Sequence, residues 1–550
     1  MSNRPRPGIL SRSVSLEKLA QSLPSGPPPA TLPEGPSHSR RGFLRSISAG
    51  TALAGASLGA LSGTLLSGPD RSATAGDANE QTRLGINRDQ DLFRVRMEIE
   101  VNGNVNLLQD PLVRNSKKRM LPIEAKLALD YEERYLRPAG ATADSEIIAA
   151  ERHFHEATGT SRISRNDQEI TLRHSVGDVI ARRDELPETI YSNDDYLTHE
   201  EMDLLRTPIA STAIDALVPD QMMRAGEKVT LLSSDLASFF NLSAIASSDV
   251  QVELVAANAA EAKLQLRGKM HGSVSGVPTE LKVVGKLTLD RKAGAVTWAA
   301  VAVHETREIG NAEPGFDVTA TIRMVRKPLP SVQTLPQAPQ RIAFDEPPPA
   351  SRLLVTMASD HVGVEGLMDR RWRVMKDLPG EAVLRMIEND RSIAQLNLKP
   401  LPRLVEGKQL SLEQFQSNVE KTLGDRFGEL IGSSEGMTEG GLRMLHVVVG
   451  GRVEGVPIQW IMMHLSDDSR RRVLATWTMD GQSVPLLAGS DTQLAASLRL
   501  TGDTGNTGQS DPDSGKNDKN LELSAAESGD EVESGAAVAE LLSPSDVKSR

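Results

Sequence analysis

The chain contains 550 residues, with 62 Lys and Arg against 74 Asp and Glu, and no cysteine. This length exceeds what one hydrophobic core usually organises, so we expect two folded domains with tails. The absence of cysteine excludes disulfides, thiol catalysis, thiolate metal sites and a lipid-modified N-terminal cysteine. The formal net charge of -12 argues against a nucleic acid partner, because phosphate binding needs a cationic surface.

The first 75 residues contain an export pattern. Residues 1–38 are rich in Pro and Ser and predict a disordered leader. The motif SRRGFLR follows, and no charged residue comes after it until Asp70. The motif residues are Ser39, Arg40, Arg41, Phe43, Leu44 and Arg45. They resemble the bacterial twin-arginine translocation signal, S/T-R-R-x-F-L-K. Ala73 and Ala75 have the A-x-A spacing that a signal peptidase accepts, so we expect 39–75 to be a signal peptide cleaved after Ala75.

This resemblance implies a chain that folds before transport by the twin-arginine translocase and works in the periplasm or outside the cell. Two alternatives stay open. An uncharged run longer than about 18 residues can span a bilayer, so an uncleaved signal would anchor the chain in the membrane. The Gly, Ser and Thr in the run disfavour insertion relative to a Leu-rich span. The motif is also compatible with chance occurrence in an unfolded leader.

Residues 83–327 are predicted to form a β-rich α+β domain with an antiparallel sheet. Apolar and charged residues alternate over 93–101, the period of a half-buried strand, and Asn102-Gly103 is the expected turn. A second alternating stretch covers 123–131. From residue 228 six further strand-like stretches follow one another closely. This spacing favours antiparallel pairing, because parallel neighbours need longer crossovers.

The same domain is predicted to contain a helical insert. The segment 143–159 has apolar residues in a helical pattern and ends at a glycine, and Thr198 and Glu201 have the spacing of a capping box. The arrangement resembles exported bacterial β-rich proteins of an uncharacterised family, a resemblance that implies no activity.

Seven prolines fall between Lys327 and Arg352, and they predict an extended interdomain linker over 328–351. Residues 352–500 then form a second predicted domain. It begins with a hairpin-like run, and a helix follows at the Ser411–Gln414 capping box. Three strands and a closing helix complete this domain. The last segment, 501–550, is acidic, has few large apolar residues and predicts a disordered tail.

The second domain carries a family resemblance. The stretch WIMMHLSDDSRRRVLATWTM reads as a strand, a polar turn and a strand, and a helix ending in SLRL follows Leu486 and Leu487. This order resembles the PsbP-like (DcrB-like) fold, a compact α/β sandwich of secreted and lumenal proteins. The resemblance covers residues 352–500. It implies protein-binding or assembly roles more often than catalysis, and it brings no catalytic residues.

Three groups of residues suggest chemistry, and each has a simpler explanation. His153 and His155 form an H-x-H pair, but residues i and i+2 of a helix point apart, so a helix would hold them as two solvated side chains. His304, Glu305, Arg307 and Glu308 at a strand end fit an exposed, charged sheet face. His464 with Asp467 and Asp468 lacks a nucleophile in its own structural context, since no G-x-S-x-G elbow is present.

Large side chains in the second domain are the remaining candidates. Trp460, Met462, His464 and Trp477 are interpreted first as sheet core, with a binding surface as the alternative. Neither a phosphate loop nor a dinucleotide fingerprint is present, and we predict no cofactor and no metal.

The sequence therefore favours an exported, non-enzymatic binding or assembly protein of the bacterial envelope, with a ligand carrier as the nearest variant. Its partners would be the translocase during export and an envelope protein or ligand of unknown identity. The alternative is a hydrolase or metal-dependent enzyme. Converging ionisable groups with perturbed pKa values would favour the enzyme, whereas an exposed apolar surface would favour binding.

Overall fold

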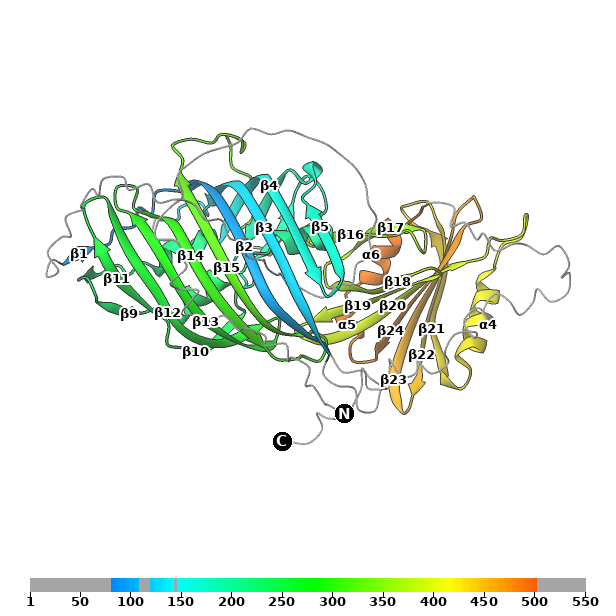
Figure 1. The fold of residues 1–550 in the computed structure, drawn as a ribbon. Coiled ribbons are helices and arrows are strands. Elements are labelled where there is room, and N and C mark those ends of the chain that lie inside the picture. Colours follow the sequence, from blue (N-terminus) through cyan, green and yellow to red (C-terminus); the bar gives the residue numbers. More distant parts are fainter. Residues whose placement is uncertain (1–80, 108–118, 143–145, 502–550) are drawn as a thin grey trace, which may run out of the picture.

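The computed structural model describes residues 81–107, 119–142 and 146–501. The predicted leader, signal peptide and acidic tail lie outside these residues. Figure 1 shows a large curved sheet beside a second, smaller sheet that follows it in the chain. Antiparallel β-structure dominates both parts and helices are few, which is broadly compatible with the α+β prediction.

The large sheet is built from long antiparallel strands. Its strands are β2 (Leu92–Leu107), β3 (Arg119–Leu136), β4 (Ala149–Ile163), β5 (Asn166–Thr171), β6 (Asp178–Arg182), β7 (Thr189–Ser192), β9 (Lys228–Thr230), β10 (Ala244–Ser248), β11 (Gln251–Ala257), β12 (Glu261–Val274), β13 (Val277–Asp290), β14 (Ala295–Arg307) and β15 (Gly315–Pro328). The strand order is β7-β6-β4-β3-β2-β15-β14-β13-β12-β11-β9, with β5 beside β4 and β10 beside β12. The first and last long strands, β2 and β15, pair with each other, which joins the two halves of the sheet.

One face of this sheet packs on short helices. These are α2 (His199–Leu205), η2 (Ser211–Leu217) and α3 (Ser233–Phe240), while η1 (His174–Val176) and the strand pair β1 (Thr82–Arg83) with β8 (Met222–Met223) lie nearby in the chain. Alternate residues of β2, including Val95, Met97 and Ile99, are buried in the same core cluster as Leu204 and Phe239. Burial of the apolar half of each strand is what holds the sheet against its helices.

The predicted helix over 143–159 is wrong, because residues from Ala149 onward form β4. Both faces of the first part of β4 are buried, so the two-residue alternation that marks a half-buried strand is absent there. Ala150 joins the main core, and Ala149 joins a small cluster on the opposite face. Because apolar residues therefore follow one another here without alternation, their spacing also fitted a helix.

The turn predicted at Asn102-Gly103 is also wrong, since β2 continues to Leu107 between β3 and β15. A Cβ atom on Gly103 would lie 2.2 Å from the carbonyl oxygen of Asp317. Glycine is therefore needed at this position for the close approach of β15, and it does not mark a chain reversal.

The smaller sheet has seven antiparallel strands in the order β18-β19-β20-β24-β23-β22-β21. They are β18 (Trp372–Leu378), β19 (Glu381–Glu388), β20 (Arg391–Leu401), β21 (Phe427–Met437), β22 (Arg443–Val453), β23 (Val456–Ser466) and β24 (Arg472–Asp480). A separate sheet contains β16 (Leu354–Ser359), β17 (Val364–Asp369) and β25 (Arg499–Leu500). The short helices are η3 (Ala350–Arg352), α4 (Leu412–Leu423), η4 (Gly424–Arg426), α5 (Val484–Leu487) and α6 (Ser490–Ser497).

Helix α4 covers one face of the smaller sheet and confirms the predicted capping box. The Ser411 hydroxyl accepts a hydrogen bond from the Gln414 backbone N–H at 3.2 Å, and the Gln414 side chain accepts one from the Ser411 N–H at 3.1 Å. Phe415 and Val419 of α4 then pack on Val447 of β22. The opposite face of the sheet belongs to the main core, which continues from the large sheet. The two sheets therefore share one hydrophobic cluster.

The proline-rich segment 329–349 lies on the outer face of β3, β4 and β6, and it contains no helix or strand. Buried side chains of the sheet hold its backbone. The Glu132 carboxylate accepts hydrogen bonds from the Gln333 and Thr334 N–H groups at 2.9 Å each. Arg182 donates to the carbonyl oxygens of Ala343 and Glu346 at 2.8 and 3.0 Å.

Candidate functional site

The predicted histidine pair is placed differently from the sequence-based expectation. His153 and His155 lie on a strand, so their rings share a face, with centroids 5.2 Å apart. His153 Nδ1 lies 2.7 Å from an oxygen of Asp178, and His155 Nε2 lies 3.5 Å from the Thr334 hydroxyl. No group of three or more His, Asp or Glu side chains within the described ranges has a geometry that could hold a metal ion.

The other two predicted groups form ordinary pairs. His304 Nε2 lies 2.8 Å from an Asp317 oxygen across β14 and β15, and Arg307 binds its neighbour Glu305. Asp467 binds Arg471 in the β23–β24 turn, with 2.7 Å between Oδ2 and Nε. His464 is not bound to these acids, so the predicted His-Asp-Asp group is not assembled.

The candidate binding surface lies inside the protein. Trp460 and Met462 are 6% exposed and pack with α4, His464 is 1% exposed, and Trp477 is fully buried on the other face of the sheet. These four side chains form no exposed surface, and their interpretation as sheet core is the one that the structure supports. The export-signal residues Ser39, Arg40, Arg41, Phe43, Leu44 and Arg45 and the cleavage residues Ala73 and Ala75 lie outside the described residues.

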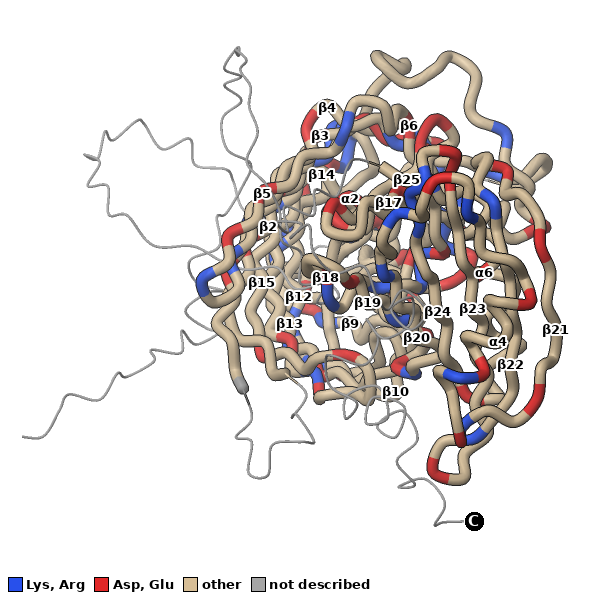
Figure 2. The backbone as a smooth tube through the Cα atoms, turned by 90° about the vertical axis from the view of Figure 1, so that its right-hand side faces the viewer, with Lys and Arg blue, Asp and Glu red and all other residues tan. Residues whose placement is uncertain are grey.

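A cluster that the sequence analysis missed lies where the two halves of the protein meet. We call it the junction cluster; it consists of His199, Asp203, Arg206, Glu313, Arg370 and Arg373. The first three come from α2 and its C-terminal end, Glu313 precedes β15, and the last two flank the start of β18. Figure 2 shows α2 beside β17 and β18, with acidic and basic positions close together.

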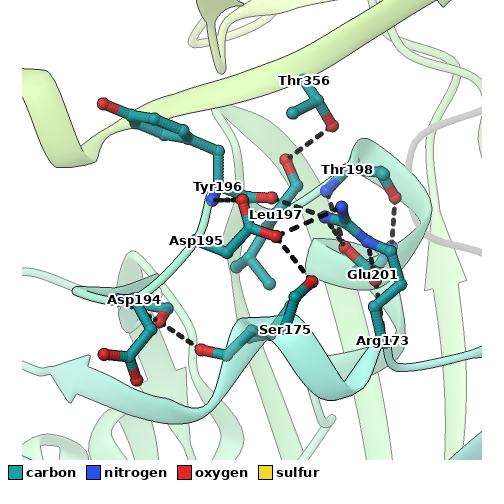
Figure 3. A network of polar contacts seen from close by, with 11 residues as sticks. Arg173, Ser175, Asp194, Asp195, Tyr196, Leu197, Thr198, Glu201 and Thr356 are labelled. Atoms are coloured by element: carbon teal, nitrogen blue, oxygen red, sulfur yellow. Dashed lines mark hydrogen bonds and ion pairs between the residues drawn. The ribbon is translucent and has the colours of Figure 1, made fainter.

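A hydrogen-bond network fixes α2 at its N-terminus (Figure 3). The Thr198 hydroxyl accepts from the Glu201 N–H at 3.1 Å, and Glu201 accepts from the Thr198 N–H at 2.9 Å. Glu201 also binds Arg173 through Nε and Nη2, both at 2.8 Å. The Thr356 N–H of β16 donates to the Leu197 carbonyl at 2.9 Å, and the Thr356 hydroxyl lies 3.5 Å from the same oxygen, which ties this network to the second half of the chain. The capping box predicted from sequence is thus confirmed and sits beside the junction.

Asp390 fixes the other side of the junction. It lies in the β19–β20 turn, where Asn389 and Asp390 have φ values of 48° and 60°. Its carboxylate is 7% exposed and accepts hydrogen bonds from the N–H groups of Asn311, Ala312 and Glu313 at 2.7, 2.8 and 3.1 Å. Turn residues with positive φ favour Asn and Asp, which explains this pair chemically. The bond from the Glu313 N–H to Asp390 therefore fixes the position of Glu313 at the junction.

Desolvation perturbs the ionisable groups of the cluster. Burial raises the pKa of Asp203 and of Glu313, and it lowers the pKa of Arg206. Burial, and then the charge of Arg206, lower the pKa of Arg370 to about 10. The side chains of Asp203 and Arg206 still keep 33% and 29% exposure. The cluster is therefore crowded by protein yet reachable from solvent, as ligand sites between domains commonly are.

A second feature is the edge strand β21, which ends the smaller sheet (Figure 2). Leu430, Ile431 and Met437 are 46%, 54% and 66% exposed. The register with β22 shifts at Phe427/Glu429 and again at Leu430/Gly432. In the described part of the chain no strand pairs with the free edge of β21. An edge strand presents unpaired N–H and C=O groups, so β21 combines backbone bonding capacity with exposed apolar side chains.

Comparisons with known proteins give a partial similarity. No family model and no curated protein matches the chain. Cyanobacterial PsbP (CyanoP) from Synechocystis aligns over 27% of this chain and 92% of its own, at 17% identity and a TM-score of 0.22. A Pseudomonas aeruginosa protein of unknown function, a putative regulator, aligns over 26% and 94%, at 8% identity and a TM-score of 0.17.

A third solved structure, a protein from Bacteroides thetaiotaomicron, aligns over 27% of this chain but only 48% of its own, at 9% identity and a TM-score of 0.20. The chain thus spans about half the length of that protein. The PsbP-like similarity covers about a quarter of the chain, and it carries no inference about function. Among the described residues no helix is both long and apolar enough to cross a membrane.

Proposed function

We propose that the chain is an exported, non-enzymatic binding or assembly protein of the bacterial envelope that takes an extended segment of a partner protein onto the free edge of β21. The observation that carries this proposal is the exposure of Leu430, Ile431 and Met437 on β21, whose outer edge pairs with no strand among the described residues. Strand addition supplies affinity through main-chain hydrogen bonds and specificity through alternate side chains.

A charge on the edge strand tests this proposal. Ile431→Lys places a charged side chain at a position that is already 54% exposed, so the fold is expected to survive while partner binding falls at least tenfold. The measurement compares proteins captured from an envelope extract by the wild type and by the variant. Leu232→Lys is the control, because Leu232 is 66% exposed but lies at α3 in the other half. Capture of the same partners by Ile431→Lys and by the wild type would refute the proposal.

Export through the twin-arginine route is part of the proposed function and has its own test. Lysine keeps the charge but lacks the planar donor fork of arginine, so Arg40→Lys combined with Arg41→Lys is expected to hold the precursor in the cytoplasm. Cell fractionation and N-terminal sequencing of the exported form measure this effect. The single change Arg12→Lys, in the leader, is the control and should export normally. Export of the double variant at the wild-type level would contradict the prediction.

The enzyme alternative keeps one supporting observation. Burial raises the pKa of Asp203 and of Glu313, and the charge of Arg373 opposes this shift at both carboxyl groups. Raised carboxyl pKa values are typical of general acids. The guanidinium groups beside them carry only hydrogen-bond donors, however, so the cluster as a whole is better suited to binding an anion than to exchanging protons.

A further inference from the structure

His199 lies against Arg373 with a neutral ring. Arg373 Nη1 lies 3.2 Å from His199 Nδ1 and 3.3 Å from the carbonyl oxygen of Trp372. A guanidinium group carries only donors, so it can approach a neutral imidazole nitrogen at this distance but would be repelled by a charged ring. Burial and the charges of Arg373 and Arg206 keep the pKa of His199 well below its ordinary value, so the ring is neutral at pH 7. Within the described residues, Nε2 is buried and has no hydrogen-bond partner.

The neighbouring guanidinium groups have N–H donors that no described residue accepts from. Arg373 uses Nη1 for His199 and for the carbonyl oxygens of Arg370 and Trp372, and no described residue accepts from its Nε or Nη2. Within the described ranges, Arg206 makes one ion pair, with Asp203 at 3.6 Å, which is too long for a good hydrogen bond. Among the same residues, Arg370 donates only to the carbonyl oxygens of Leu353 and Ile190, both at 3.1 Å.

We propose that the junction cluster binds the anionic group, a carboxylate or a phosphate, of a small ligand, with Arg206 and Arg373 as the principal contacts. An anion offers several acceptor oxygens and no donor, which matches the set of unused donors. Arginine forks bind such groups in a bidentate manner. The site goes beyond the proposed function, because it is built from α2, β18 and the β14–β15 loop and uses no residue of β21.

The acidic side chains of the cluster predict a second effect on anion affinity, opposite in direction to that of the arginines. Asp203 lies against Arg206 and opposes a second negative charge there. Removing its charge should therefore strengthen anion binding, whereas removing an arginine should weaken it. A purely structural ion-pair cluster would not give opposite effects on ligand affinity.

The experiment titrates the purified full chain with inorganic phosphate and, separately, with citrate, by isothermal titration calorimetry at pH 7 and constant ionic strength maintained with chloride. We expect saturable binding of at least one probe, and the probe that binds more tightly identifies phosphate or carboxylate as the preferred group. Arg373→Gln and Arg206→Gln should each weaken binding about tenfold, the loss of roughly one charge-assisted contact. Asp203→Asn should strengthen it severalfold. Arg323→Gln, at a 44% exposed side chain on the large sheet, should leave affinity unchanged.

Thermal unfolding of each variant shows whether it is folded, and if Arg373→Gln does not fold, Arg206→Gln and Asp203→Asn still decide the matter. The proposal is overturned if neither probe gives a saturable heat, or if the arginine variants that fold bind as tightly as the wild type. Loss of partner capture by Ile431→Lys without loss of anion binding would leave this site intact, so the two proposals can fail separately.

Discussion

Replacing Arg152 with methionine is expected to lower the free energy of unfolding by about 3–5 kcal/mol. Arg152 of β4 is 3% exposed and joins two buried carboxylates. Its Nε donates to Glu133 at 2.9 Å, and its Nη1 donates to Glu188 at 2.9 Å. Methionine fills similar space but leaves both acids inside the protein without their countercharge, and this uncompensated burial is the source of the loss.

Chemical denaturation of the wild type and the variant, followed by circular dichroism, measures the effect. Arg162→Met is the matched control on the same strand, because Arg162 is 56% exposed and its ion pair with Asp167 is open to solvent, so this change should have little effect on stability. Adding Glu133→Gln and Glu188→Gln to Arg152→Met should recover part of the loss, since neither buried carboxylate then lacks the charge of Arg152. A loss of under about 1 kcal/mol for Arg152→Met would show that Glu133 and Glu188 do not depend on the charge of Arg152.

The fold was predictable wherever one face of a strand is polar. The alternation in 93–101 and 123–131 identifies β2 and β3, and the closely spaced stretches after residue 228 identify the antiparallel arrangement of β11 to β15. Strand β4 was misread because the proline-rich segment covers its outer face, which removes the polar half of the pattern. Coverage by a segment about 190 residues later in the chain cannot be read from a local window.

The junction cluster shows why sites between sheets are harder to predict. Its arginines come from the end of α2 and from the run DRRWR before β18, and this run alone reads as the start of a hairpin. Only tertiary structure brings Arg206 near Arg373. The clearest local signal was the pair Asn389-Asp390, a residue pair that favours positive φ in tight turns. It predicts the turn but not the three backbone N–H groups that Asp390 binds across the junction.

Acid should destabilise the second half of the protein through His464. Both ring nitrogens of His464 are buried without a partner among the described residues, and Phe415 lies against the ring with centroids 6.0 Å apart. Burial, followed by the charges of Arg472 and Arg443, lowers the pKa of His464 from 6.5 to about 4. The folded protein therefore disfavours the charged ring, and no nearby acid compensates.

The sign of the effect follows from where the proton binds first. As the pH falls below 6.5, His464 of the unfolded chain takes up a proton while the folded chain does not, so the free energy of unfolding falls until about pH 4, where both states are protonated. The loss across this window is about 3 kcal/mol for a shift of this size. The histidine at position 464 is not alone in this respect, because the pKa values of His199 and His446 are also lowered.

The variant His464→Leu removes the contribution of His464 and leaves the other two. Denaturation curves at pH 7, 5.5 and 4 should therefore show the stability of His464→Leu rising relative to the wild type as the pH falls. His271→Leu is the control, because the side chain is exposed and the variant should follow the wild type. Parallel pH profiles for His464→Leu and the wild type would mean that His464 can be protonated in the folded protein at little cost.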